Sequence, residues 1–205
     1  MLDPADVAAV LFDADGTLVD SDAAVERAWT AWALERGIDP SAALEIAHGS
    51  PAEHTVATLV PGLDAAELVV SAARQLALQY DDLGDVGPMP GVQRLMAVLR
   101  RRGLPWAVVT SGDRRLATAR LAAAAIATDV LVTVEDVVAG KPDPEGYLLA
   151  ARTLGVPPSR CLVVEDSEPG LAAGRAAGAM TVALKGLDGD LSVTGLAELA
   201  DWLDV

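Results

Sequence analysis

The feature that most constrains the fold is a short apolar run that ends abruptly in polar residues and recurs along the chain. Residues 7–12 read VAAVLF and are followed at once by DADGT. The same design recurs in PWAVVTSGD, DVLVTVED and RCLVVEDS, with apolar runs at 106–109, 130–134 and 161–164, and MTVALKG (180–186) is a fifth candidate. Such runs are typical of strands that are buried on both faces and have polar carboxyl ends at the edge of a sheet.

Helical patterns separate these strands. The segment GVQRLMAVLRRRG places Val92, Leu95 and Leu99 on one face and ends in three arginines and Gly103, as macrodipole and C-cap preferences predict. Further helical patterns follow in RRLATARLAAAA, PEGYLLAARTLG and SEPGLAAGRAAG. This alternation predicts an α/β fold, with an open, parallel, Rossmann-like sheet flanked by helices on both faces.

The alternation is interrupted between residues 19 and 88, where the patterns are all helical. GDVGPMPG at the end of this stretch is rich in Gly and Pro, as a hinge should be. We therefore expect a core made of residues 1–18 and 89–205, and an inserted all-helical cap of residues 19–88. The insertion leaves the core directly after the first polar strand end, so it is placed to fold over a site there. We expect Asp20 and Ser21 to cap its first helix.

The charge of the chain excludes some partners. Lys plus Arg number 15 against 30 for Asp plus Glu, which gives a formal net charge of −15. The negative electrostatic field of such a chain repels nucleic acid and anionic lipid, so we expect neither as a partner. The N-terminus lacks the positive charge of a signal peptide, and no apolar run approaches the ~18 residues of a membrane span. The single cysteine, Cys161, fits a reducing compartment as a buried side chain, and we expect a soluble, monomeric protein of the cytoplasm.

The candidate functional residues follow the predicted strands. They are Asp13 and Asp15 after the first strand, Thr110, Ser111 and Gly112 after the second, and Glu165 and Asp166 after another. The carboxyl ends of parallel strands meet at one edge, where open α/β sheets bind ligands. Four converging carboxylates would repel one another, and a hard divalent cation such as Mg²⁺ resolves that conflict.

Two further features suit a phosphate group. Lys141, one of two lysines in the chain, lies in a loop before a helix, where it can offset the charge of carboxylates and a phosphate. Ser111 and Gly112 offer a hydroxyl and backbone amides before a helix that starts near Arg114. Structural alternatives exist: Lys141 as a surface lysine, and Ser111 or Asp113 as a helix cap.

Four motifs carry a family resemblance. LFDADGTLVDS, VVTSG, GKPDPEGY and VVEDSEPGLAAGRAAG occur in this order and together resemble the motifs of the haloacid dehalogenase-like hydrolase superfamily, in the branch with a helical cap. Within that superfamily, AVERAWTAW, AHG and PWAVVTSG are similar to bacterial sugar-phosphate and polyol-phosphate phosphatases.

The resemblance implies roles for particular residues. Asp13 would attack phosphorus and form an aspartyl-phosphate, and Asp15 would protonate the leaving oxygen and later activate water. Ser111 and Lys141 would hold the phosphoryl group, beside Thr110 and Gly112. The same resemblance implies a Mg²⁺ ion held by the metal ligands Asp13, the main-chain carbonyl of Asp15, and Asp166, with Glu165 in support.

The composition of the cap bears on the substrate. Its cations are Arg27, Arg36 and Arg74, against twelve acidic residues. His48 precedes Gly49, where related phosphatases continue with a basic residue but this chain has Ser50, and we count His48 among the candidate substrate contacts. Trp29 and Trp32, three residues apart, are expected to pack in the core of the cap.

We predict a Mg²⁺-dependent phosphomonoesterase that acts on a small sugar or polyol phosphate. One alternative is a β-phosphoglucomutase-like isomerase, which the shortage of cap cations disfavours because a doubly phosphorylated intermediate needs cationic contacts. Another is a phosphate-binding protein without catalysis, which would not require Asp15 beside Asp13. A dehalogenase is disfavoured because that chemistry in the family does without the second aspartate.

Overall fold

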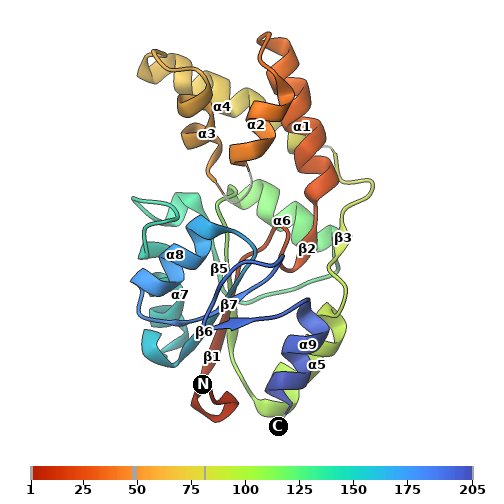
Figure 1. Ribbon diagram of the computed structural model, residues 1–205, viewed down its shortest axis with the longest axis vertical. Coiled ribbons are helices and arrows are strands. Elements are labelled where there is room, and N and C mark those ends of the chain that lie inside the picture. The colour runs from red at the N-terminus through yellow and green to blue at the C-terminus, as the bar shows by residue number, and fades with distance from the viewer. Residues whose placement is uncertain (1, 48–49, 81, 205) are drawn as a thin grey trace.

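The computed structural model describes residues 2–47, 50–80 and 82–204, and a parallel sheet lies at its centre (Figure 1). Within the described residues this sheet has six strands in the order β5-β4-β1-β6-β7-β8. The strands are β1 (Ala9–Phe12), β4 (Trp106–Val109), β5 (Leu131–Val132), β6 (Cys161–Glu165), β7 (Met180–Ala183) and β8 (Leu191–Ser192). The chain runs from β1 to β4 and β5 on one side and from β6 to β7 and β8 on the other, so the order switches between β1 and β6. Ligands bind at such switch points in open α/β sheets.

The central position of β1 in the sheet explains why its sequence is an unbroken apolar run. Val10 and Phe12 pack into one hydrophobic cluster with helices on one face of the sheet. Ala9 and Leu11 pack into a second cluster on the other face. All four side chains are at most 1% exposed, because a central parallel strand has no solvent-facing side.

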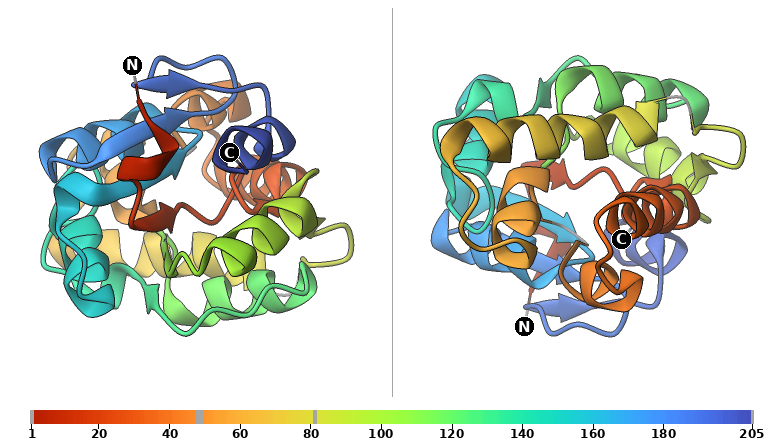
Figure 2. Two further views of the ribbon diagram at one scale, coloured as in Figure 1. Left: turned by 90° about the horizontal axis from the view of Figure 1, so that it is seen from below. Right: turned by 90° about the horizontal axis from the view of Figure 1, so that it is seen from above.

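Helices cover both faces of the sheet (Figure 2). Helices α5, α6 and α9 contribute to the first cluster, while α7 and α8 contribute to the second. Their bounds are α5 (Val92–Arg102), α6 (Arg114–Ala123), α7 (Glu145–Leu154), α8 (Glu168–Ala176) and α9 (Leu196–Leu203). The predicted α/β class with a parallel sheet is therefore confirmed.

Four more helices lie beyond the carboxyl ends of the strands, at the top of Figure 1. They are α1 (Asp22–Glu35), α2 (Pro40–Ala47), α3 (Ala52–Leu59) and α4 (Ala65–Tyr80). The two short antiparallel strands β2 (Val19–Asp20) and β3 (Gly87–Pro88) flank them in the chain. These helices share a hydrophobic cluster of their own around Trp29 and Trp32, whose rings meet edge to face with centroids 5.3 Å apart. The predicted packing role of both tryptophans is confirmed.

Some elements differ from the prediction. The strand expected at 130–134 is shorter, because the side chains of Thr133 and Asp136 form a capping box that starts a 3₁₀ turn at Val134–Asp136. The edge strand β8 and helix α9 were not predicted. None of the described helices combines the length and the apolar character needed to cross a bilayer.

The buried thiol of Cys161 gives a first prediction. Cys161 lies at the start of β6 with no exposed surface, and desolvation raises the pKa of its thiol to about 11. Because the thiolate is the reactive species, we expect no reaction with a disulfide reagent such as DTNB in the folded protein at pH 8. Unfolding in denaturant should release one reactive thiol per chain. Rapid labelling of the folded protein would contradict this expectation.

Candidate active site

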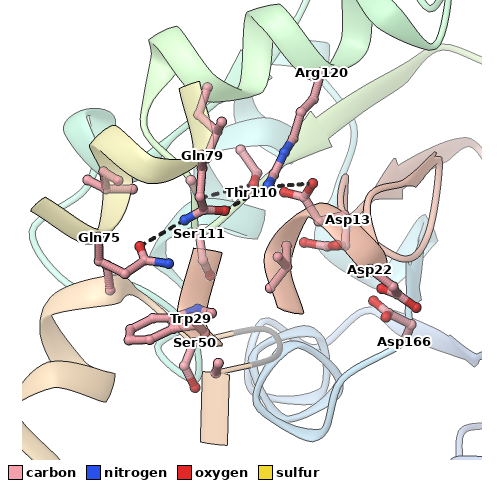
Figure 3. A pocket seen from close by; sticks show the side chains of 17 residues that line it. Asp13, Asp22, Trp29, Ser50, Gln75, Gln79, Thr110, Ser111, Arg120 and Asp166 are labelled. Atoms are coloured by element: carbon pink, nitrogen blue, oxygen red, sulfur yellow. Dashed lines mark hydrogen bonds and ion pairs between the residues drawn. The ribbon is translucent and has the colours of Figure 1, made fainter. Parts of the chain in front are cut away.

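Residues that follow β1, β4 and β6 border one cavity together with residues of α1 and α4 (Figure 3). Asp13, Ser111 and Asp166 line it from the strand ends. Trp29 and Gln75 line it from α1 and α4. Residues that are far apart in the sequence thus share one site.

Asp13 directly follows β1, and its amide still bonds to the sheet, donating to the carbonyl of Val164 at 3.0 Å. Its carboxylate accepts a hydrogen bond from Nζ of Lys141. The chain then turns sharply at Gly16, where φ is +80° and a Cβ atom would overlap the Asp166 carboxylate. Only glycine fits there, because a left-handed backbone and a close approach coincide.

Lys141 is a buried lysine, and so the alternative of a surface lysine is wrong. Its side chain is 5% exposed, and Nζ lies 2.6 Å from Oε1 of Glu165 and donates to the carbonyl of Val109 at 2.9 Å. Burial alone would lower the pKa of Lys141, but the neighbouring Asp13 and Glu165 carboxylates raise it above its usual value. The ammonium group is therefore held charged next to Asp13.

Glu165 is fully buried, and protein donors surround both of its oxygens. Oε1 accepts from the hydroxyl of Tyr147 at 2.7 Å and contacts Lys141. Oε2 accepts from the hydroxyl of Ser167 at 2.9 Å and from the amide of Asp166 at 3.2 Å. The side chain thus anchors the lysine and the start of the next loop. Ser167 also accepts from the amide of Gly170 and is the N-cap of α8.

Asp166 faces the cavity beside Asp13. Its oxygens accept from the hydroxyl of Thr17 at 3.1 Å and pair with Nζ of Lys185 at 2.9 Å. Lys185 also pairs with Asp22 at 2.8 Å. Thr17 and Lys185 were not among the predicted site residues, although Thr17 follows Asp13 and Asp15 in DADGT and Lys185 lies near the end of MTVALKG.

A divalent cation fits this group of carboxylates. Asp13, Glu165 and Asp166 each offer an oxygen, and these atoms lie within 4.8 Å of one another. Desolvation raises the pKa of the Asp13 carboxyl, against the effect of Lys141, and it raises that of Asp166 against the effect of Lys185. Burial and mutual repulsion therefore oppose the charged forms, and a hard cation bound by oxygen would relieve both.

The side chain of Asp15 lines the same cavity and has its own hydrogen-bond partners. Its Oδ1 accepts from the hydroxyl of Ser21 at 2.7 Å and from Nη1 of Arg120 at 2.8 Å. Ser21 occupies the N-cap position of α1, but its side chain accepts from no helix amide, so the expected capping contact was wrong. Arg120 was missed by the sequence prediction. A clue was its position on α6 between the buried residues Leu116 and Leu121.

The loop after β4 lies at the start of α6. The hydroxyl of Thr110 accepts from the amide of Gly112 at 3.0 Å, and Ser111 lines the cavity. Asp113 caps α6 by accepting from the amide of Leu116 at 2.7 Å, which confirms one of the two capping alternatives. His48 and Gly49 lie outside the described residues.

The α/β architecture thus places carboxylates and a buried lysine at a topological switch point, where open α/β sheets bind ligands. The family model described as haloacid dehalogenase-like hydrolase matches residues 7–178. The chain belongs to this hydrolase family, which confirms the resemblance found in the motifs.

The chain is also similar to individual phosphatases and to solved hydrolase structures. The chain is 41% identical over 175 residues to hexitol phosphatase A of Escherichia coli (strain K12), covering 85% of this chain and 81% of the relative. It is 34% identical over 192 residues to 2-deoxyglucose-6-phosphate phosphatase 1 of Saccharomyces cerevisiae, and this match covers 85% of this chain and 78% of the relative. Among solved structures, a hydrolase from Pseudomonas syringae superposes with a TM-score of 0.87 at 25% identity, covering 96% of this chain and 98% of that one.

Proposed function

We propose that this protein is a Mg²⁺-dependent phosphomonoesterase that hydrolyses a small sugar or polyol phosphate through an aspartyl-phosphate on Asp13. The observation that carries the proposal is the contact of the buried ammonium of Lys141 with Asp13, which lines the cavity together with Asp166. The phosphatase relatives support the same reaction class.

In the proposed reaction, a carboxylate oxygen of Asp13 attacks phosphorus, and the bond between phosphorus and the alcohol oxygen breaks. Asp15, which also borders the cavity, gives a proton to the leaving oxygen and then takes one from the water that hydrolyses the aspartyl-phosphate. Lys141 offsets the negative charge between Asp13 and the phosphoryl group. Ser111, near the start of α6, holds phosphoryl oxygens, and the hydrogen bond from the amide of Gly112 to the hydroxyl of Thr110 orders the loop around it.

The carboxylates of Asp13 and Asp166 and the main-chain carbonyl of Asp15 would hold Mg²⁺. The bound ion supplies positive charge that offsets the phosphoryl oxygens. Glu165 would act in support: its oxygens already bond to Tyr147, Lys141 and Ser167, so it keeps the lysine in place.

We further propose that residues 19–88 form a cap domain over a core of residues 1–18 and 89–205. The separate hydrophobic cluster of helices α1 to α4 supports this division, and so does the position of β2 and β3 at both ends of the segment. We propose a monomer in the cytoplasm, where the buried thiol of Cys161 suits a reducing environment.

The lining of the cavity supports a substrate whose far end is uncharged. Among the described lining residues, Arg120 is the only cation, and its charge is paired with Asp15. The described residues that α1 and α4 contribute to the cavity include Val25, Trp29 and Gln75, none of which is cationic. A second phosphate would find no counter-charge among them, which disfavours the isomerase and favours a monophosphorylated sugar or polyol.

The test is a panel of phosphate monoesters assayed for release of inorganic phosphate. We expect turnover of hexitol and hexose phosphates with Mg²⁺, loss of turnover after chelation with EDTA, and recovery when Mg²⁺ is restored. Interconversion of hexose phosphates without net phosphate release would favour the isomerase. Phosphate binding without turnover of any ester would favour a protein that only binds.

A further inference from the structure

A series of hydrogen bonds links Arg120 to Gln79 and Gln75 of helix α4 (Figure 3), and it begins at the acid-base candidate Asp15. Arg120 of α6 donates from Nη1 to Asp15 at 2.8 Å and from Nη2 to Oε1 of Gln79 at 2.7 Å. Nε2 of Gln79 then donates to Oε1 of Gln75 at 2.8 Å. Gln75 is fully buried, Arg120 is 2% exposed and Gln79 is 6% exposed.

The guanidinium group of Arg120 determines which atom donates and which accepts in each of these hydrogen bonds. Arginine can only donate hydrogen bonds, so the carbonyl oxygen of Gln79 must face Arg120. The amide nitrogen of Gln79 is then directed to Gln75, whose carbonyl oxygen must accept. The amide nitrogen of Gln75 is thereby left as the last donor in this series of hydrogen bonds.

That last donor has no acceptor. Among the described residues, Nε2 of Gln75 is one of three buried side-chain atoms that have no hydrogen-bond partner. Gln75 lines the same cavity as Asp13, together with Trp29 and Leu76. A buried donor that stays unsatisfied costs free energy, so this position favours a bound molecule with an acceptor atom at that point.

We propose that Gln75 determines specificity by donating a hydrogen bond from Nε2 to a hydroxyl oxygen of the leaving group. The proposal rests on the proposed phosphatase function and refines its substrate class to phosphates of polyhydroxylated alcohols. A carboxylate would also accept this hydrogen bond, but the cavity is already lined by Asp13, Asp15 and Asp22, which repel a second anionic group. Gln79 and Arg120 hold the Gln75 amide in the donating orientation.

The test compares two esters with carbon chains of equal length, a hexitol 6-phosphate and n-hexyl phosphate. The readout is the ratio of their kcat/KM values, because any general effect of a variant on the chemistry cancels in the ratio. We expect the substitution Gln75→Leu, which removes the donor at similar volume, to lower this ratio at least about tenfold. Gln75→Glu retains an acceptor for Gln79 but has no donor, and should lower the ratio as well.

The exposed Gln93 of α5 provides the matched control, and Gln93→Leu should leave the ratio unchanged. An unchanged ratio in both Gln75 variants would overturn the proposal, and would show that a water molecule or no ligand group satisfies the amide. If the wild-type protein hydrolyses neither these esters nor any other phosphate monoester, the proposed function itself fails. Hydrolysis by the wild type with an unaltered ratio in the variants would refute only the role of Gln75.

Discussion

Replacement of Asp13 by asparagine is expected to lower phosphate release at least about 10³-fold, because the amide cannot serve as the nucleophile. The substitution keeps the size of the side chain, and Lys141 retains Glu165 and the carbonyl of Val109 as partners. We therefore expect a folded protein that binds substrate but does not turn it over. Single-turnover and steady-state phosphate assays on a hexitol phosphate would measure the loss.

The control is Asp6→Asn, the same chemical change at an exposed aspartate before the amino end of β1. This variant should retain wild-type activity. Activity of Asp13→Asn within tenfold of the wild type would exclude Asp13 as the nucleophile, provided that both variants show the same circular dichroism spectrum.

The second large effect concerns stability. An alanine at Gly170, near the start of α8, would place its Cβ atom on the carboxylate of Glu165. That carboxylate cannot move easily, because Tyr147, Lys141 and Ser167 all bond to it. We expect Gly170→Ala to lower the free energy of unfolding by about 3 kcal/mol, measured by urea denaturation. The usual effect inside a helix has the opposite sign, since alanine is favoured over glycine by about 1 kcal/mol.

A matched variant is available at Gly84, where an added Cβ atom would meet nothing within 4 Å. Gly84→Ala should change the free energy of unfolding by less than about 0.5 kcal/mol. We also expect Gly170→Ala to reduce activity, because displacement of Glu165 releases Lys141. Stability equal to that of the wild type would indicate that the Glu165 network is not as rigid as its hydrogen bonds imply.

The sequence predicted the central fold well because buried parallel strands leave a strong local signal. Residues 7–12 and 161–164 are apolar on both faces, and polar residues begin where each strand ends. The edge strand Leu191–Ser192 was missed because two residues carry no periodicity. Helix α9 was missed although its apolar residues follow helical spacing, with Leu196, Leu199, Ala200 and Leu203 all buried.

The site was predictable in part. Residues directly after a strand could be assigned to one edge of the sheet, which brought Asp13, Ser111 and Asp166 together from the sequence alone. Arg120, Gln75 and Gln79 could not be found this way, because they lie within helices and reach the site only through tertiary packing. The hydrogen bond from the hydroxyl of Ser21 to Asp15 was not predicted from the sequence either.

The position of Trp29 gives the protein an optical reporter of its own. Trp29 is one of four tryptophans, it is 3% exposed, and it borders the cavity while its ring stacks edge to face on Trp32. Indole emission depends on the polarity of its surroundings, so a ligand that displaces solvent beside Trp29 changes the fluorescence of the unlabelled chain. Occupancy of the cavity can then be followed separately from turnover, including in variants that no longer release phosphate.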